Sequence, residues 1–310
     1  MTTEPNAPQN GFEGAQPIAP AEIPALRRFA WLLRRELWES RSIYLAPFAV
    51  TGLILFGAVL GAFQMPAKMR GIAGLAPAAQ HAAFTDHYMM ASLLLMATTF
   101  VVSLFYCLDA LQSERRDRSI LFWKSLPVSD LITVLSKATV PFVILPLLTV
   151  ALAAAAHAIM LLLSSAVLMA SGQDPGALWA HVSLPEMWLM LLYHMVTAHV
   201  LWYAPIYGWL LFVSAWARRA PWLWAILPPL ALGVVEKIAF GSSVLGDLLA
   251  NRLSGGPGGM EFTAASRMMD PLMQMTPGTF LASAGLWVGL VVAAGFVGGA
   301  VWLRRRRGPV

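Results

Sequence analysis

Residues 112–130 read QSERRDRSILFWKSLPVSD and separate two long apolar runs that are almost free of charge. Five charged residues stand in succession at 114–118, and the apolar residues ILFW follow at 120–123. A segment between two membrane spans lies outside the bilayer but close to its surface, and a solvated linker has no need of exposed aromatic side chains. The stretch therefore predicts a short helix at the membrane surface that docks onto another protein.

The composition places the chain in a membrane. Of its 310 residues, 58% are hydrophobic and 12% are charged, whereas about 25% of residues are charged in an average soluble protein. Several apolar runs exceed the roughly 18 residues that mark a transmembrane helix. These features predict an all-α polytopic membrane protein. They argue against a nucleic-acid partner, because the positions of the basic residues along the chain are set by the expected membrane spans.

The pattern along the chain divides it into a tail, an amphipathic helix and one membrane domain that together with this helix covers 24–310. Residues 1–23 are polar and predict a disordered cytoplasmic tail. In 24–42, apolar residues recur at steps of three and four between arginines, which is typical of a helix lying in the headgroup plane. Six transmembrane helices are expected at about 43–63, 87–111, 138–170, 187–216, 222–244 and 277–303.

The third expected span is unusually long. The 33 residues of 138–170 would reach about 50 Å as a helix, well beyond a hydrocarbon core of about 30 Å. No polar turn divides the run, so we expect one tilted helix bent near Pro141 and Pro146. The glycine-rich segment 246–276 predicts an irregular loop with a short helix at 246–253.

Lysine and arginine are distributed unevenly about these spans. Sixteen of the 21 lie on one side of the expected membrane, four lie on the other, and Lys237 falls within the fifth span. Because positive residues concentrate in cytoplasmic loops, both termini and the 112–137 loop are expected in the cytoplasm. The chain contains no G-x-x-x-x-G-K-[ST] phosphate loop. An ATP-driven step would therefore require another polypeptide.

The sequence resembles the permease subunits of ABC exporters of the ABC-2 type over nearly its whole length. The resemblance rests on WLLRREL ahead of the first span, on six spans with cytoplasmic ends, and on 105–137, FYCLDALQSERRDRSILFWKSLPVSDLITVLSK. The last stretch is similar to the family signature D-x-L-x-x-E-R-x-x-x-S-I-x-F-x-x-S-L-P-V-S. The positions that match it are Asp109, Glu114, Arg115, Ser119, Ser125, Leu126 and Pro127.

The resemblance implies that residues around 114–128 form a coupling helix held in a groove of a separate ATPase subunit. It also implies two cytoplasmic ABC ATPase subunits, which carry ATP and Mg, and a second permease copy or homologue in a bacterial cytoplasmic (inner) membrane. No cofactor or metal is expected in this chain, and the chain is not expected to be an enzyme. The residues expected to contact the ATPase are Glu114, Arg115, Arg116, Asp117, Arg118, Phe122, Trp123 and Pro127.

Polar residues within the expected spans are candidates for a transport pathway, because ionisable groups at membrane depth are costly. Simpler roles stay open for each of them: a buried histidine satisfied by a hydroxyl, helix–helix packing, or an interfacial ion pair. His194 and His199 diverge by about 140° on one helix and are poor joint ligands for a metal. The candidate pathway residues are His157, His194, Thr197, Tyr203, Glu236 and Lys237.

Together with the resemblance, these features predict a permease driven by ATP hydrolysis in a partner and surrounded by membrane lipid. The resemblance implies export, and the apolar spans favour an amphipathic small molecule, peptide or lipid as the substrate. One alternative is a non-transporting membrane scaffold that recruits a cytoplasmic partner through the same loop. The other is an intramembrane enzyme built on His157, His194 or His199, for which no paired catalytic motif occurs at helical spacing.

Overall fold

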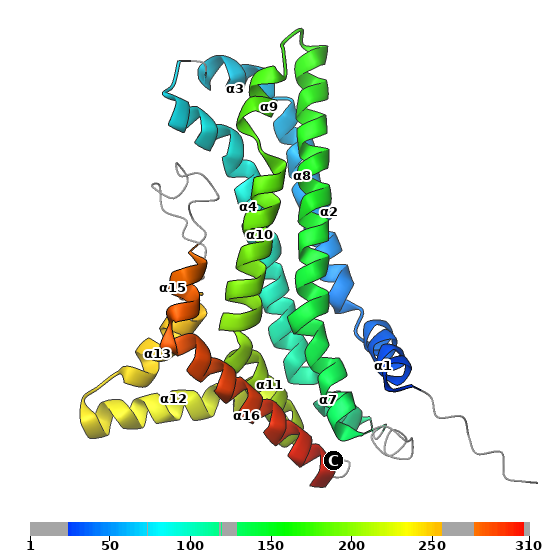
Figure 1. Cartoon of the computed structure of the whole chain (residues 1–310), viewed down its shortest axis with the longest axis vertical. Coiled ribbons are helices and arrows are strands. Elements are labelled where there is room, and N and C mark those ends of the chain that lie inside the picture. The colour runs from blue at the N-terminus through cyan, green and yellow to red at the C-terminus, as the bar shows by residue number, and fades with distance from the viewer. Residues whose placement is uncertain (1–23, 73, 118, 120–128, 256–275, 307–310) are drawn as a thin grey trace, which may run out of the picture.

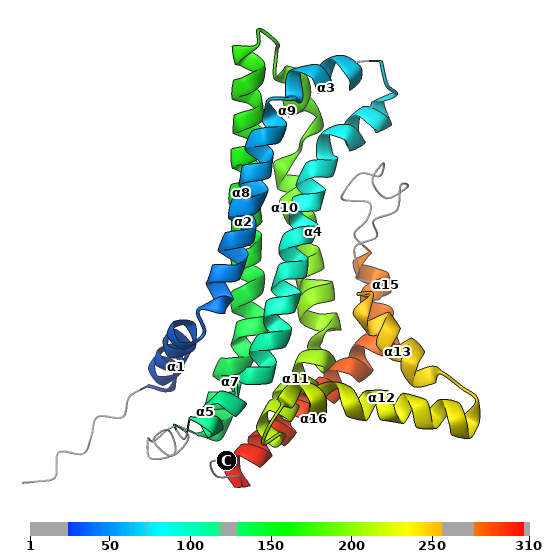
Figure 2. The same ribbon diagram turned by 180° about the vertical axis from the view of Figure 1, so that it is seen from behind.

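Helical columns stand side by side in an elongated bundle, as both side views show (Figures 1 and 2). The computed structural model describes residues 24–72, 74–117, 119, 129–255 and 276–306. Every regular element in these ranges is a helix, so the all-α prediction is confirmed for them. The columns are α2 (Ser42–Ala62), α4 (Pro77–Asp109), α7–η1–α8 (Asp130–Thr139, Val140–Ile144 and Leu145–Ala170) and α10–η2–α11 (Leu184–His194, Met195–Trp202 and Ala204–Trp216).

Short helices lie at the two ends of this bundle. At one end, α3 (Met65–Ile72) and α9 (Gly176–His181) lie across the column tops, and we call this the α3 end. At the other end, α1 (Ala25–Glu39) and α5 (Gln112–Arg116) lie beside the ends of α7 and α4, and we call this the α1 end (Figure 2). The helix predicted at 24–42 is therefore found as α1, followed directly by α2.

The bundle contains helices that are suited to a membrane. Five are long and apolar enough to cross one: Ser42–Ala62, Ala79–Arg116, Asp130–Ala170, Pro221–Phe240 and Ala284–Arg306. A sixth candidate arises if the bent pair Gly176–Trp202 and Ala204–Trp216 is taken as one span. The described part of the chain is thus a helical protein of membrane character, as the composition predicts.

The third expected span is one continuous helix, but it begins at Asp130 instead of at 138 and is 41 residues long. Lys137 does not end it, because this side chain is only 1% exposed and is paired with carboxylates. Pro141 lies in the π-helical segment η1 and Pro146 in the first turn of α8. A prolyl nitrogen carries no hydrogen, so the backbone ladder is rearranged at these positions.

Two expected spans are interrupted in the structure. In the span expected at 187–216, the chain bends by 47° at Tyr203 after the π-helical segment η2, and it is one candidate span only if the bent pair is taken together. The span expected at 277–303 is found as the candidate span Ala284–Arg306, because α15 (Pro277–Ala282) and α16 (Ala284–Arg306) are separated at Ser283, whose ψ is 119°. Apolar sequence shows where a helix is stable in lipid but not where it is broken by tertiary contacts.

One buried arginine contacts both interruptions. Arg252 belongs to α13 (Val244–Leu253), the short helix expected at 246–253, and is 8% exposed. It donates to the carbonyl oxygen of Trp202 at 3.1 Å and to that of Gly285, and its guanidinium lies 4.1 Å from the Trp202 ring centroid. Backbone carbonyls released by a helix break need a donor when water is absent. Arg252 supplies that donor to the Trp202 carbonyl at the end of η2, and its bond to Gly285, in the first turn of α16, connects the two breaks.

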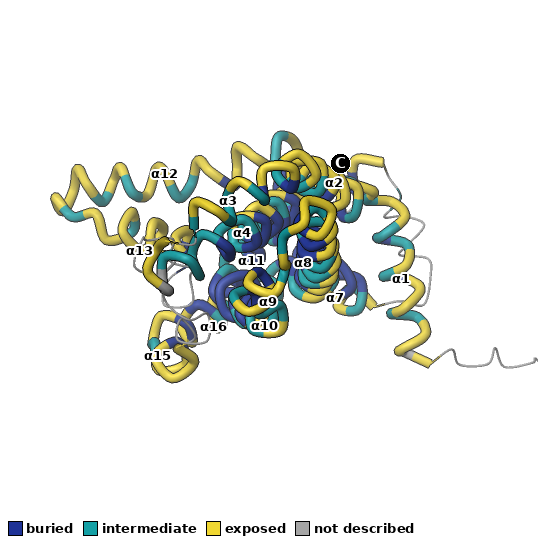
Figure 3. The backbone as a smooth tube through the Cα atoms, turned by 90° about the horizontal axis from the view of Figure 1, so that it is seen from above, coloured by how far each residue is buried: buried dark blue, intermediate teal, exposed yellow. Residues whose placement is uncertain are grey.

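Helix α12 (Pro221–Phe240) does not run alongside the columns. It extends sideways from the α1 end, and its surface is largely exposed where the column interiors are buried (Figures 1 and 3). Ala220 precedes it with a φ of 49°, and only 6% of its apolar stretch is buried inside the chain. A six-span bundle within one chain would place α12 among the other helices, and the single chain leaves its apolar surface uncovered.

Helices α11 and α16 approach each other closely through glycine. A Cβ atom added at Gly208 would lie 3.0 Å from the carbonyl oxygen of Ala293 and 3.2 Å from its Cα. A Cβ atom at Gly299 would lie 3.0 Å from the ring of Phe212. Small residues let helix backbones come together in a membrane, where packing rather than water exclusion drives association.

Substitution of Gly208 by valine is expected to destabilise the protein by about 1–3 kcal/mol, because the side chain would overlap the backbone of α16. The measurement is thermal unfolding of the purified chain in detergent. Gly295→Val on α16 is the matched control, since a Cβ atom there would meet nothing within 4 Å. Equal losses in the two variants would contradict the close-packing role of Gly208.

Candidate functional site: a buried ion cluster at the base of the 112–130 segment

Three carboxylates and three cations meet inside the α1 end of the bundle. They belong to α1, α5, α7 and α16, which are far apart in the sequence but converge at this end (Figure 2). We call the set the ion cluster. Its members are Arg35, Glu36, Glu114, Asp130, Lys137 and Arg304.

Glu114 is the centre of the ion cluster. One carboxylate oxygen lies 3.2 Å from Lys137 Nζ and 3.3 Å from Arg35 Nη2, and the other accepts a hydrogen bond from Arg304. Glu114 is 2% exposed. A single residue of α5 is thereby held by α7, α1 and α16 at once.

Glu36 extends the ion cluster from α1 to α4. Its carboxylate accepts from Lys137 Nζ at 2.8 Å and from the hydroxyl of Tyr106 at 2.9 Å. Lys137 therefore bridges Glu36 and Glu114. On the far side, Arg304 Nε lies 3.0 Å from Oδ1 of Asp130, in the first turn of α7.

The charges of the ion cluster balance. Burying an ion costs several kcal/mol, and the cost is offset only when partners of opposite charge and hydrogen bonds surround it. Burial opposes the charged form of Arg35, but its hydrogen bond with Glu39 and the charge of Glu114 raise its pKa above the usual value. The cluster has three formal positive and three formal negative charges, and each of its ions has a counter-ion.

Arg115 fixes the same segment to the end of α11. Its guanidinium donates to the carbonyl oxygens of Ser214 at 2.7 Å and Ala217 at 2.6 Å. In return, Ser214 Oγ accepts from the backbone N–H groups of Leu111 at 2.9 Å and Gln112 at 3.0 Å. The last carbonyls of a helix have no partner within it, and a cation there satisfies them and opposes the helix dipole.

The structure divides the residues that were expected to contact an ATPase. Glu114 and Arg115 are 2% and 4% exposed and direct their polar atoms to this chain. Their expected place on a docking surface therefore needs correction, because buried counter-ions and orphan helix carbonyls hold them inside. The sequence signal, a run of charge between two spans, does not distinguish an inward from an outward charge.

Arg116 and Asp117 do face outward. Each side chain is 62% exposed, and they pair with each other at 3.2 Å. Arg116 also lies 3.9 Å from Asp109, at the end of α4. The remaining expected contacts, Arg118, Phe122, Trp123 and Pro127, lie outside the described residues.

Sequence reasoning missed most of the ion cluster. Glu36 lies within a basic helix, Lys137 stands at the end of the predicted 112–137 loop, and Arg304 directly follows the last expected span. A usable signal was present, since all three stand at the same expected side of the membrane next to apolar runs. Their mutual contact depends on how four helices pack, which no local pattern encodes.

His157 is a packing residue between α8 and α4 in this structure. It is fully buried, and its Nε2 lies 3.0 Å from the carbonyl oxygen of Tyr88 and 3.3 Å from Ser92 Oγ. The hydroxyls of Thr99 and Thr149 form a second bond between the same helices. Nε2 thus has the neighbours expected for the simpler of the two roles weighed for the residue, whereas the buried Nδ1 has no hydrogen-bond partner among the described residues.

The candidate pathway residues expected on the fourth span, His194, Thr197 and Tyr203, also bond to backbone carbonyls of this chain. His194 Nδ1 lies 2.8 Å from the carbonyl oxygen of Met190, and Thr197 Oγ1 donates to that of Tyr193 at 2.8 Å, both within their own helix. Tyr203 stands at the bend and donates to the carbonyl oxygen of Leu253 at 3.2 Å. These contacts hold the bent column together.

Glu236 and Lys237 lie on α12, away from the bundle interior. The Glu236 carboxylate accepts from Ser242 Oγ at 2.6 Å and from the backbone N–H groups of Val244 at 2.7 Å and Leu245 at 2.9 Å. It therefore caps α13, whose first N–H groups have no partner within the helix. Lys237 Nζ donates to the carbonyl oxygen of Gly241 at 3.4 Å. The two residues do not pair with each other.

Comparison with protein-family models, with curated proteins and with solved structures found no match to this chain. Among the residues that the structure describes, no three His, Cys, Asp or Glu side chains come together to hold a metal ion. Function must therefore be inferred from the chain's own residues and their contacts, and the ion cluster is the feature with the most such contacts.

Neutralising one member of the ion cluster is expected to destabilise the protein by about 3–5 kcal/mol, because it leaves an unpaired buried charge. Glu36→Gln and Lys137→Met are the single variants, and the double variant restores the balance by removing one charge of each sign. We expect the double variant to lose less free energy of unfolding than the sum of the losses in the two single variants. Thermal unfolding in detergent measures all three, and additive losses would contradict a direct Glu36–Lys137 pairing.

Proposed function

We propose that the chain is the membrane-spanning permease subunit of an ATP-driven exporter of the ABC-2 type. In this proposal, residues 114–128 couple it to two separate cytoplasmic ATPase subunits that hold ATP and Mg. The observation that carries the proposal is the attachment of Glu114, at the start of this segment, to α1, α7 and α16. The chain itself then needs no catalytic site.

Coupling requires a stiff connection between the docking segment and the spans. A displaced loop moves a helix only if the base of the loop is fixed, and a flexible base would absorb the movement. Glu114 and Arg115 fix this base through charge-assisted hydrogen bonds, which are about twice as strong as neutral ones. A push on the segment would thus reach the third span through α7, the last span through α16, and the bent column through α11.

The proposal assigns ATPase contact to the residues just beyond this base. Arg116 and Asp117 are exposed there, and Phe122, Trp123 and Pro127 follow in the sequence. Aromatic and arginine side chains supply most of the binding energy at protein interfaces. Buried Glu114 and Arg115 would act as positioning residues and would not touch the partner.

The transport pathway is proposed to lie between two permease copies in a bacterial cytoplasmic membrane, with both termini in the cytoplasm and six spans in each copy. The exposed apolar helix α12 supports an assembly larger than one chain, because only 6% of its apolar stretch is buried inside this chain. An amphipathic small molecule, peptide or lipid would suit a pathway lined by spans as apolar as these. A scaffold that only recruits a cytoplasmic protein would have no need of a stiff link to several spans.

The test separates docking from coupling. The tagged chain is purified from its native membrane, and the readouts are a co-purified polypeptide that contains a phosphate loop and vanadate-sensitive ATP hydrolysis. The docking variant, Arg116→Glu with Phe122→Ala and Trp123→Ala, is expected to reduce ATPase recovery by more than about tenfold. Arg219→Glu is the control, since it reverses an exposed charge outside the segment.

Glu114→Gln addresses coupling in the same preparation. Since this change also destabilises the ion cluster, recovery is counted per folded chain by thermal unfolding; on that basis ATPase recovery is expected to stay near the wild-type level while substrate-stimulated hydrolysis falls, because the base of the segment is loosened. Normal recovery and normal stimulation in both the docking and the Glu114→Gln variants would overturn the proposed role of the segment. Recovery of a partner without a phosphate loop would favour the scaffold.

Pairing of two copies through α12 is tested by cross-linking in membranes. Cys107 is buried, so a newly introduced cysteine is the accessible one among the described residues. Ile238→Cys on α12, where the side chain is 81% exposed, is expected to form a disulfide-linked dimer. Leu53→Cys on α2, 64% exposed, is the control. Equal cross-linking at both positions would indicate random collision instead of an interface.

A further inference from the structure

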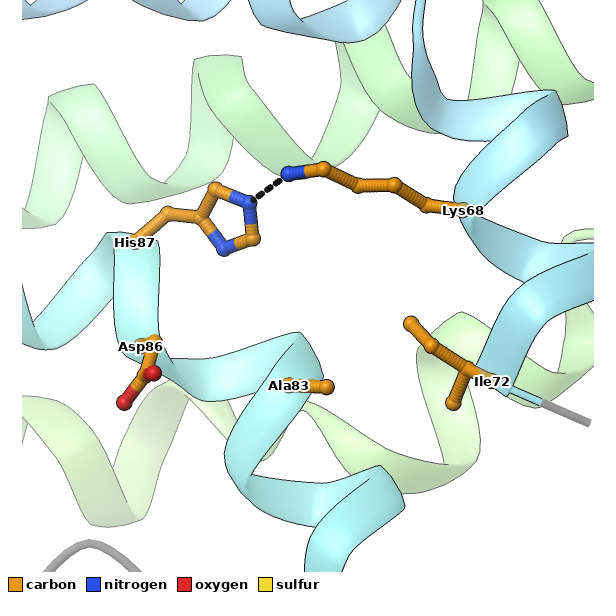
Figure 4. A pocket seen from close by; sticks show the side chains of 5 residues that line it. All are labelled: Lys68, Ile72, Ala83, Asp86 and His87. Atoms are coloured by element: carbon orange, nitrogen blue, oxygen red, sulfur yellow. Dashed lines mark hydrogen bonds between the residues drawn. The ribbon is translucent and has the colours of Figure 1, made fainter. Parts of the chain in front are cut away.

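Two hollows adjoin at the α3 end of the bundle, opposite the ion cluster, and His87 lines both. The first has a volume of 430 Å³ and lies between α3 and the start of α4 (Figure 4). The second has a volume of 320 Å³ and lies mainly between α2 and α4. Ligand sites typically have volumes of about 300–1,000 Å³ and combine an apolar lining with a few polar groups.

The first hollow carries a cation among polar and apolar lining residues. Lys68 reaches across from α3, and its Nζ lies 2.8 Å from His87 Nε2 on α4 (Figure 4). An ammonium group has three donors and no acceptor, so His87 accepts this bond and Lys68 keeps two further donors. The carboxylate of Asp86 points away from the pair. Lys68 therefore presents hydrogen-bond donors and positive charge to the hollow, which Asp86 also lines.

The second hollow is an apolar groove on the surface of the bundle. Gly57 and Gly61 open it on the α2 side, where an added Cβ atom would meet nothing within 4 Å. Met90 and Leu94 flank it on the α4 side and are 59% and 42% exposed. Between Ile54 and Ala62 the groove follows α2 for about 12 Å along a candidate span.

We propose that the two hollows form one site for an anionic phospholipid. The phosphate of the headgroup would accept hydrogen bonds from Lys68, and an acyl chain would lie in the groove over Gly57 and Gly61. Lysine binds phosphate as a point charge, so an ammonium group at the end of a span can hold the headgroup of an anionic lipid. A free phosphate would leave the groove empty, and a lipid without net charge would bring no added negative charge to Lys68, from which the Asp86 carboxylate points away.

This site is independent of the proposed exporter function, because it lies at the other end of the bundle from the docking segment. It assigns roles to Lys68 and His87, which no earlier step used. Arg70, on the same helix, is exposed and lines neither hollow. The site therefore offers a matched pair of basic residues, one inside the hollow and one outside.

The experiment uses the full chain, purified in a mild detergent and incubated with phosphatidylglycerol or phosphatidylcholine, with bound lipid counted by native mass spectrometry. Lys68→Gln is expected to reduce retention of phosphatidylglycerol by about tenfold, as the loss of one charge-assisted hydrogen bond predicts. Arg70→Gln removes the same charge outside the hollow and is expected to leave retention unchanged. Equal losses of phosphatidylglycerol retention in the two variants would mean that charge alone attracts the lipid, and this would overturn the proposed site.

A second variant tests the groove without changing any charge. Gly57→Leu is expected to fill the groove and to reduce retention of both lipids, whereas Gly52→Leu is the control on the same helix, where an added Cβ atom also meets nothing within 4 Å. Glycerol phosphate in excess is expected not to displace the lipid. Unchanged retention in Gly57→Leu would exclude the groove, and displacement by glycerol phosphate would identify a free-phosphate site instead. Thermal unfolding of each variant shows whether it is folded.

Discussion

The pairing of Glu114 with three cations constrains the whole α1 end of the bundle. A carboxylate that is 2% exposed cannot remain ionised unless positive charges surround it, and these charges come from α1, α7 and α16. Each cation in turn restricts the position of its own helix. The base of the loop that joins the second and third spans is therefore attached to elements near both ends of the chain.

Buried basic side chains solve a second problem in this protein, the satisfaction of backbone carbonyls. Arg115 donates to the carbonyl groups at the end of α11, and Arg252 donates to those at the two helix interruptions. In an apolar surrounding, an orphan carbonyl costs several kcal/mol. Guanidinium groups with five donors can satisfy several carbonyls at once. The bent shape of the chain around Tyr203 and Ser283 depends on this chemistry.

Much of the fold could be predicted from local composition. The run 138–170 lacks a polar turn and is part of one helix, and the amphipathic pattern at 24–42 corresponds to α1. The bend at Tyr203 and the sideways course of α12 could not be predicted, because the residues there are as apolar as in a straight span. For the candidate site, the segment was found but its orientation was not. Glu114 and Arg115 were expected on the surface and are buried.

The sequence by itself determined the helical class, the membrane character and the position of the charged segment, because each follows from residues that are neighbours along the chain. Only the tertiary structure decided which charges face inward. Glu114 meets Arg35 across 79 residues and Arg304 across 190, and the gain from such pairs exists only after the helices have packed. The same holds for the hollows beside His87, which form where α2, α3 and α4 come together.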